Sequence, residues 1–498
     1  MTVAEQRQEL RPLALAGLIL ALLAGLVVAF GSPLVLVLFL ALLAGMVLIA
    51  YPTALLWLVL IGGLVFSGLA ELYLPQLRHL RWGVVIAAVA LGLAGILSLF
   101  FQKKVRAGSF SSIPFNPLIW LGIFFVIALF SAFLNRGFSF DAVIGLKGYF
   151  QVYGIVLALA WVAMRPATVD RYVKFLLWLA LLQIPFALHQ YLVLVPQRLS
   201  QSAAYNLIVA PDIVVGTFVG SLGGGGGSAI LAVLQVTAMG MALAFCRAGK
   251  MSVSVTAGLS FAYLVPLALN ETRITFVLLF VMLGVVFHDQ VFRHPVKMFI
   301  AAIAASLLVF AFAVIYTYLP RAPWQQNADI RDHYEKTMEY NFGEKGYGGM
   351  VLNRTTVYPF WMQHHGLKNL GETLIGHGPG ATNEGDAGLM RHSLARDSYR
   401  RIGIGLTGIS ALLWETGVLG LSAILAAFAS VLFQAHSITR KIPGNTVQWA
   451  LLKGVEAGIA MLAVSLLHNN YVVFEIGFQS MLMLMLGYVL HVRRRLTD

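Results

Sequence analysis

Apolar runs of about 17 to 25 residues dominate the chain, and short polar or glycine-rich breaks separate them. Because a helix needs roughly 20 apolar residues to cross the hydrocarbon core of a bilayer, each run predicts a membrane span. The pattern predicts an all-α polytopic membrane protein with about fourteen transmembrane helices. These lie near 12–30, 33–50, 53–71, 83–101, 116–134, 141–163, 172–195, 227–246, 252–270, 272–288, 298–318, 405–433, 454–472 and 475–491.

One long polar stretch, residues 319–405, interrupts this pattern. It holds ten of the 34 Lys and Arg residues, nine of the 21 Asp and Glu residues and five of the 12 histidines. Unsatisfied polar groups are excluded from lipid, so this stretch must lie in water on one side of the membrane. We therefore expect an N-terminal bundle of about eleven spans (1–318), a loop subdomain (319–405) and a C-terminal bundle of about three spans (406–498).

Local patterns divide the loop subdomain further. Residues 328–342 and 355–370 have the amphipathic pattern of short helices, whereas the Gly, Pro and Asn content of 376–388 predicts a turn-rich loop. A second irregular stretch, 196–230, contains five consecutive glycines from Gly223 to Gly227. Such a run does not nucleate a helix. It is either a flexible hinge or a re-entrant segment that lines a cavity.

Composition supports a membrane protein: 59% of the residues are hydrophobic and 11% charged, and the mean hydropathy is +0.82. A soluble domain carries about a quarter charged residues. The single cysteine, Cys246, excludes an internal disulfide and a thiolate metal cluster. The first apolar run has no small-residue cleavage site, so we expect it to be retained as a span.

The net charge of +13 arises mainly beside the apolar runs, where orientation signals belong, rather than in a nucleic-acid-binding patch. With the N-terminus inside, the predicted cytoplasmic segments carry eighteen cations and the short outer loops five, which predicts cytoplasmic termini and an outward-facing loop subdomain. The eighteen are Arg7, Arg11, Lys103, Lys104, Arg106, Arg165, Arg171, Lys174, Arg247, Lys250, Arg293, Lys297, Arg440, Lys441, Lys453, Arg493, Arg494 and Arg495. The five are Arg78, Arg81, Arg136, Arg198 and Arg273, and Lys147 is the one cation left within a predicted span.

Three outward-facing places carry candidate chemistry. Arg273 follows Asn270 at the mouth of a predicted span, and Arg354 precedes a predicted helix; each is either an anion-binding group or a solvated anchor. The third place is the glycine-rich turn with the cationic residues after it, which either grips a lipid diphosphate or anchors the loop to headgroups. It comprises Gly376, His377, Gly378, Gly380, Arg391, His392, Arg396, Arg400 and Arg401.

Several enzyme classes lack their signatures here. The chain has no H-E-x-x-H, G-x-S-x-G, P-loop or paired-cysteine motif. His364 and His365 are adjacent, so on a helix they face different sides, and we predict neither a metal nor another cofactor. Outward-facing cations remain, and they suit a reaction whose leaving group is an anionic phosphate.

Four motifs in order resemble the superfamily of O-antigen ligases and O-antigen or exopolysaccharide polymerases. They are NETRITF at 270–276, LNRTTVYPFW at 352–361, LIGHGPGAT at 374–382 and LLWETGVLGL at 412–421. The resemblance covers residues 200–435, and the flanking spans match by topology. It implies a metal-independent inverting glycosyltransferase that acts on glycans linked to undecaprenyl diphosphate.

The resemblance further implies that Arg273 and Arg354 bind the diphosphate while an acceptor hydroxyl attacks the anomeric carbon. Ligases of the superfamily carry a His eleven residues before the glycine of E-T-G, where this chain has Leu406. This departure counts against transfer to a lipid A core and leaves the general base open. The candidates are His392, Glu384, Asp386 and Glu415, the last of which has a structural alternative as a hydrogen-bonded residue at the start of a span.

The leading prediction is a bacterial inner-membrane polymerase that joins repeat units of a surface polysaccharide at the periplasmic face. Its expected partners are the undecaprenyl-diphosphate-linked glycan, the lipid bilayer and other polysaccharide-assembly or chain-length-control proteins, with no nucleic acid. Two alternatives remain: a ligase that transfers a glycan to a lipid or protein acceptor, and a transporter of lipid-linked oligosaccharide. A transporter is expected to have paired halves and charged residues deep in several spans.

Overall fold

The computed structural model describes residues 50–76, 81–101, 116–137, 139–204, 213–220, 226–270, 272–293, 350–366, 369–384 and 392–497, with the single residues 25, 296, 343, 346 and 390. Within these ranges the regular structure is helical, apart from an isolated antiparallel bridge between Gly220 and Gly226. The predicted helix at 328–342 and the predicted spans 12–30, 33–50 and 298–318 lie outside the described residues, except for Gly25 and Ala50.

Eight helices in the described part of the chain are long and apolar enough to cross a membrane. This is the architecture of a polytopic membrane protein, as the hydropathy pattern predicts. The eight are the continuous α3–η1–α4 helix (Pro52–Tyr73), α5 (Arg81–Phe101), α7 (Pro117–Arg136), the long α10 (Pro166–His189) with its extension, α12 (Ser228–Arg247), α21 (Gly408–Lys441), α22 (Val447–Ser465) and α24 (Ile476–Thr497).

Of three further predicted spans, one is a bent pair of helices and two are single but shorter helices. The run at 141–163 forms α8 (Phe140–Tyr149) and α9 (Gly154–Trp161), which are bent by 53° at a short break. The runs at 252–270 and 272–288 form the shorter helices α13 (Val253–Leu269) and α14 (Thr275–Val286). Hydropathy averages over a window, so it does not register where the helical path breaks inside an apolar run.

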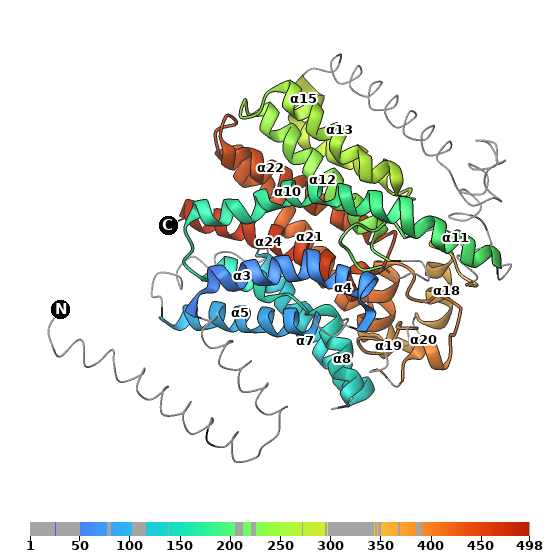
Figure 1. Cartoon of the computed structure of the whole chain (residues 1–498). Helices are drawn as coiled ribbons and strands as arrows, with labels where there is room; N and C mark the ends of the chain where they lie inside the picture. The colour runs from blue at the N-terminus through green and yellow to red at the C-terminus, as the bar shows by residue number, and fades with distance from the viewer. Residues whose placement is uncertain are drawn as a thin grey trace.

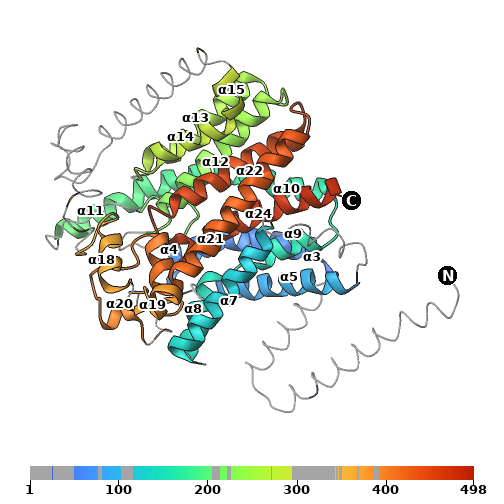
Figure 2. The ribbon, with the colours of Figure 1, turned by 180° about the vertical axis from the view of Figure 1, so that it is seen from behind.

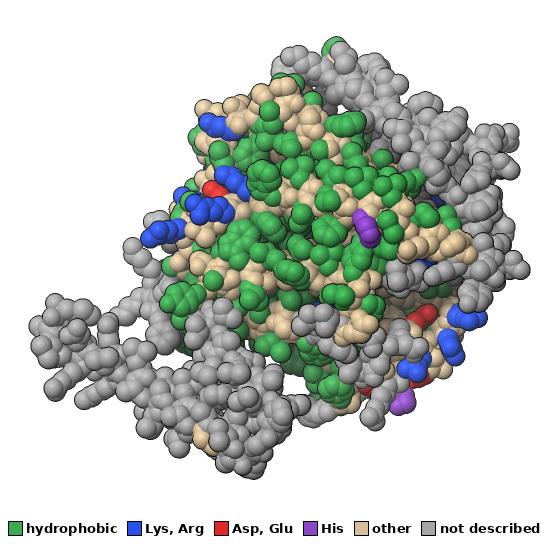
Figure 3. Space-filling view, in the orientation of Figure 1, with side chains coloured by type: hydrophobic (Ala, Val, Ile, Leu, Met, Phe, Trp, Pro, Cys, Tyr) green, Lys and Arg blue, Asp and Glu red, His purple; other side chains and the backbone are tan. Residues whose placement is uncertain are grey.

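The helices pack as a bundle in which α12, α22 and α24 lie at the centre and α5 and α7 at the edge (Figures 1 and 2). Over the 18-residue apolar segment that qualifies each helix as a span, 94% of α24 and 89% of α12 is buried inside the bundle. The corresponding share is 33% for α5 and for α7. Figure 3 shows hydrophobic side chains over the middle of the visible face, with Lys and Arg towards its two ends. An apolar girdle between charged ends suits a bilayer.

The helices α18 (Val357–His364), α19 (Leu370–Ile375) and α20 (Leu394–Asp397) gather at one end of the bundle, which we call the loop end (Figure 1). The C-terminus lies at the opposite end, which we call the tail end. Helices α18 and α20 share a small core with the start of α21, made of Leu352, Val357, Trp361, Ala395, Ile404, Leu413 and Trp414. The predicted helix at 355–370 is thus the shorter α18, and the predicted turn from 376 is irregular as far as it is described.

Candidate functional site

A kink in α21 organises the loop end. Gly417 lies inside this helix with φ 65° and ψ −169°, a conformation essentially restricted to glycine. The two carbonyls before the kink accept hydrogen bonds from outside the helix: the Trp414 carbonyl from the His377 N–H at 2.8 Å, and the Glu415 carbonyl from the Gly378 N–H at 3.0 Å. The glycine of E-T-G therefore turns helical carbonyls toward the glycine-rich turn.

The Glu415 side chain fixes the same turn from its other end. Its carboxylate accepts the Gly380 N–H at 2.7 Å, the Thr382 N–H at 2.9 Å and the Thr382 hydroxyl at 2.6 Å, and the residue is fully buried. On the opposite side Ser131 of α7 donates to the Ile375 carbonyl at 2.7 Å. The turn and E-T-G, 41 residues apart at Gly376 and Gly417, form one interlocked unit.

These contacts decide how Gly376, Gly378 and Gly380 act. All three are buried, and their N–H groups donate to the Glu372 carbonyl, the Glu415 carbonyl and the Glu415 carboxylate, respectively. The N–H groups of the predicted substrate-binding glycines therefore hold the turn in place. These glycines would influence a ligand indirectly, by fixing the position of the turn. For Glu415, the geometry supports the structural alternative over the role of general base.

Glu415→Gln is expected to lower the free energy of unfolding by about 1–3 kcal/mol, because the new amide group faces a buried N–H donor instead of accepting from it. The thermal midpoint of the purified protein in detergent measures this change. Asp397→Asn, an exposed acid of α20, is the control and should leave the midpoint unchanged. An unchanged midpoint together with lost turnover would instead assign Glu415 a catalytic role.

The connection between α22 and α24, residues 466–475, joins the elements of the loop end. It contains the short helix α23 (Tyr471–Phe474). Its Asn469 carbonyl accepts the Gly408 N–H at 2.9 Å at the start of α21, and Asn470 donates to the Gly405 carbonyl at 2.6 Å. These hydrogen bonds tie the connection to the start of α21 and to the residues just before it.

Arg354 lies against this connection. Its Nε donates to the His468 carbonyl at 2.7 Å, and the residue is half-buried. The preceding Asn353 is fully buried, and its Oδ1 accepts the N–H groups of Thr355 at 2.9 Å and Thr356 at 2.8 Å, which forms the turn that leads into α18. Burial and the nearby Arg354 charge lower the pKa of His468 to about 3, so its ring is neutral at physiological pH.

Arg273 lies at the same end of the bundle. It is half-buried, just before α14, and α14 packs against α22. The far ends of both helices meet at the tail end, where Arg247 donates to the Val286 carbonyl at 2.6 Å and lies 5.1 Å from the Trp449 ring. Because the two helices are antiparallel, the start of α14 and the end of α22 share the loop end. Arg273 therefore lies on the side of the bundle that carries Arg354.

The glycine-rich segment also reaches this region in its described residues. Asn270, three residues before Arg273, is buried and donates to the carbonyl of Ser228, the first residue of α12, at 2.6 Å. Two residues before Ser228, the Gly226 carbonyl accepts a hydrogen bond from the Tyr471 hydroxyl of the α22–α24 connection. A run of hydrogen bonds thus links the turn of Arg273, the end of the glycine run and the connection that holds Arg354. Gly223, Gly224 and Gly225 lie outside the described residues.

The predicted cationic cluster after the turn lies on the surface. Arg396, Arg400 and Arg401 are exposed, and Arg391 lies outside the described residues. The side chain of His392 is 81% exposed, with Nδ1 3.6 Å from the Asp397 carboxylate. These positions suit contact with headgroups or with a large soluble part of a ligand, in agreement with the anchoring alternative.

Two described acids, Glu384 and Glu475, lie near the loop end in addition to Glu415. Glu384 is half-buried and accepts the Gly403 N–H at 3.2 Å, and burial raises the pKa of its carboxyl group. Asp386 lies outside the described residues. The second acid, Glu475, was missed by the sequence analysis; it is buried and accepts the Gly477 N–H at 2.7 Å and the Val219 N–H at 3.3 Å. The sequence does mark this place, because an otherwise apolar stretch is interrupted by four polar residues: His468, Asn469, Asn470 and Glu475.

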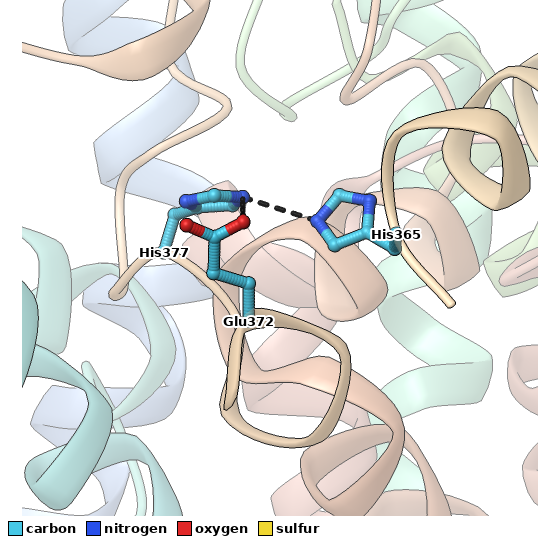
Figure 4. Close-up of side chains that lie close together, drawn as sticks. All are labelled: His365, Glu372 and His377. Atoms are coloured by element: carbon cyan, nitrogen blue, oxygen red, sulfur yellow. Dashed lines mark hydrogen bonds and ion pairs between the residues drawn. The ribbon is translucent and has the colours of Figure 1, made fainter. Parts of the chain in front are cut away.

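One group of side chains at the loop end could hold a metal ion, although the sequence analysis predicts none. Figure 4 shows His365, Glu372 and His377 with their polar atoms facing one another. The two Nε2 atoms are 3.1 Å apart, and Glu372 Oε2 lies 3.9 Å from His377 Nε2. Burial lowers the pKa of both imidazoles, which favours their neutral form. His364 points elsewhere, with Nδ1 2.9 Å from the Phe360 carbonyl.

The fold defines the class of this chain as a polytopic α-helical membrane protein with a structured loop end. Comparison with known proteins does not narrow the class, because no protein-family model matches the chain and no curated protein matches its sequence.

Proposed function

We propose that this chain is a metal-independent glycosyltransferase that polymerises repeat units carried on undecaprenyl diphosphate into a surface polysaccharide. The observation that supports it most is the position of Arg354, whose guanidinium is held against the α22–α24 connection by the His468 carbonyl. Arg273 belongs to the same end of the bundle. Two guanidinium groups at the end of an apolar bundle suit a ligand with an anionic diphosphate and an isoprenoid tail.

The proposed reaction is a single displacement. A hydroxyl oxygen of the acceptor repeat unit forms a bond to the anomeric carbon of the donor, and the bond from that carbon to the diphosphate oxygen breaks. The undecaprenyl diphosphate leaves as an anion, and the two arginines stabilise the charge that develops on it. The configuration at the anomeric carbon inverts. The proton of the attacking hydroxyl passes to a general base.

Among the candidate bases, we favour Glu384. Its carboxylate is half-buried rather than enclosed, and the raised pKa brings it closer to the range in which a carboxylate accepts a proton efficiently. His392 remains an alternative through its pairing with Asp397. Glu415 is a weaker choice because both of its oxygens already accept hydrogen bonds from Gly380 and Thr382.

The proposed orientation places the loop end in the periplasm and the tail end in the cytoplasm of a bacterial inner membrane. Cations from several helices meet at the tail end. Arg494 of α24 donates to the Ala160 carbonyl at 3.3 Å at the end of α9, and Arg247 pairs with Asp289 at 2.9 Å. Lys453 at the start of α22 pairs with Glu456 at 3.0 Å. This enrichment follows the positive-inside rule.

The test uses the purified full chain in nanodiscs with a repeat unit linked to undecaprenyl diphosphate and no nucleotide, and the products are sized by gel electrophoresis and mass spectrometry. We expect a ladder of lengthening chains, and Arg273→Ala should reduce its yield by roughly 100-fold or more, the scale found when a charge-stabilising donor is removed. Arg171→Ala, an exposed arginine of α10, is the matched control.

The same assay separates the alternatives. A single transfer to an added lipid or protein acceptor, without a ladder, would favour the ligase. Movement of the intact lipid-linked unit across a sealed vesicle, without a new glycosidic bond, would favour the transporter. A full ladder from Arg273→Ala would contradict the proposed role of that arginine.

A further inference from the structure

The cluster of His365, Glu372 and His377 has no part in the proposed transfer reaction. His365 follows α18, Glu372 belongs to α19, and His377 lies in the turn after α19. Ligand atoms of the three side chains all lie within 4.8 Å of one another. Helix α19 reverses the chain between the two histidines, so residues twelve positions apart face each other (Figure 4).

The hydrogen bonds of His365 determine which of its nitrogens is available. Nδ1 lies 3.0 Å from the Trp361 carbonyl, and because a carbonyl oxygen only accepts, Nδ1 carries the proton. Nε2 of the neutral ring therefore presents a lone pair toward His377. Metal-binding histidines commonly donate their other N–H to a backbone carbonyl in this way, which fixes the tautomer and the ring orientation.

The spacing fits a tetrahedral metal ion. Two nitrogens each about 2.0–2.1 Å from a zinc ion, at a tetrahedral angle, lie roughly 3.3 Å apart. The two Nε2 atoms are 3.1 Å apart, close to this value. Glu372 is exposed, and its Oε2 lies 3.9 Å from His377 Nε2, so its carboxylate is near enough to serve as a third ligand.

The surrounding aromatic rings hold both imidazoles in place. His365 stacks on Trp361 with ring centroids 4.7 Å apart and meets the edge of Trp414 at 4.6 Å. His377 stacks on the same Trp414 at 5.7 Å. Since Trp414 is buried in the core of the loop end, the two nitrogen ligands are positioned before any ion binds. Such support distinguishes a built site from two surface histidines that meet by chance.

We propose that His365, His377 and Glu372 form a binding site for a divalent transition-metal ion, with zinc as the first candidate. Two imidazoles and a carboxylate are typical zinc ligands, and three protein ligands leave a fourth position for water. The ion fastens the end of α18 to α19 and to the turn that is locked onto α21. Because Arg354 lies three residues before the start of α18, the ion stiffens the segment that positions this arginine.

The experiment measures metal content. The full chain is purified in detergent, freed of any affinity tag, stripped with EDTA and dialysed against limiting Zn²⁺, and the bound zinc is determined by mass spectrometry. The same samples are loaded with Co²⁺, whose visible absorption reports tetrahedral coordination. The variants are His365→Asn, His377→Asn and Glu372→Gln. His364→Asn is the matched control, because this neighbouring histidine is exposed and its Nδ1 lies 2.9 Å from the Phe360 carbonyl, outside the cluster.

We expect about one zinc ion per chain in the wild type and in His364→Asn, and at least roughly tenfold weaker binding when a histidine ligand is replaced. EDTA should lower the thermal midpoint of the wild type but not of His377→Asn. Absence of zinc from the wild type, or equal zinc in all variants, would overturn the proposal and leave the two histidines as a hydrogen-bonded pair. Glu372→Gln alters an exposed residue, so it tests the site even if a histidine variant fails to fold.

Discussion

Arg354→Ala is expected to lower the rate of chain polymerisation by roughly 100- to 1,000-fold, the scale on which a group that stabilises developing charge acts. The reason is positional as well as electrostatic. The hydrogen bond from Nε to the His468 carbonyl fixes the plane of the guanidinium at the α22–α24 connection. The rate is measured from the early growth of the ladder of products formed by the purified chain in nanodiscs with excess substrate.

Arg354→Lys is the informative companion. Lysine keeps the positive charge but lacks the planar fork that binds a diphosphate with two parallel hydrogen bonds, and it has no Nε donor at the position used here. We expect an intermediate rate, several-fold above that of the alanine variant. Arg171→Ala removes one exposed arginine elsewhere in the bundle and should behave as the wild type.

Thermal unfolding separates a catalytic defect from a folding defect. Loss of the hydrogen bond to the His468 carbonyl costs about 0.5–1.5 kcal/mol, and we expect both variants to remain folded. A rate for Arg354→Ala within threefold of the wild type would contradict the proposed diphosphate contact. A collapsed thermal midpoint would show that the residue is needed for the fold, and the lysine variant would then carry the test of its role in the reaction.

The sequence predicted the helices because their signal is local. A run such as 227–246 is long and apolar enough for a span wherever it lies, and α12 follows it within a residue or two. The break between α8 and α9 is not local in this sense. Near it, Gln479 of α24 donates to the Gly148 carbonyl at 2.6 Å, a partner more than 300 residues away. Hydropathy carries no information about such a partner.

The candidate site divides in the same way. Arg273, Arg354, the glycine-rich turn and E-T-G could each be recognised as short patterns, but the contact between the turn and E-T-G could not. That contact depends on backbone groups, the carbonyls of Trp414 and Glu415, which every residue possesses and which no pattern of side chains reveals. The pair of His365 and His377 was missed because the chain reverses between them. The prediction considered His364 and His365 on a helix that continues to residue 370, whereas α18 ends at His364.

The kink at Gly417 allows a sharper test of the contact between the glycine-rich turn and E-T-G, because the backbone at Gly417 leaves no room for a side chain. At φ 65° and ψ −169° an alanine is strained by about 1–3 kcal/mol. A Cβ atom there would also lie 2.3 Å from the Leu374 carbonyl carbon and 2.4 Å from its oxygen. Both are backbone atoms and cannot rotate away, so the turn must move off the helix.

Gly417→Ala is therefore expected to cost more than about 3 kcal/mol of stability, at the upper end of single substitutions. It should also detach the turn, which exposes the Trp414 carbonyl and the Glu415 carboxylate. Thermal unfolding and limited proteolysis of residues 376–384 measure the two effects. Gly122→Ala is the matched control, since Gly122 is an exposed glycine of α7 with open space around its Cβ position. A normal midpoint and a protected turn in Gly417→Ala would mean that α21 does not kink at this residue. The arrangement of the whole loop end around E-T-G would then have to be abandoned, because the turn reaches the Trp414 and Glu415 carbonyls only where the helix bends.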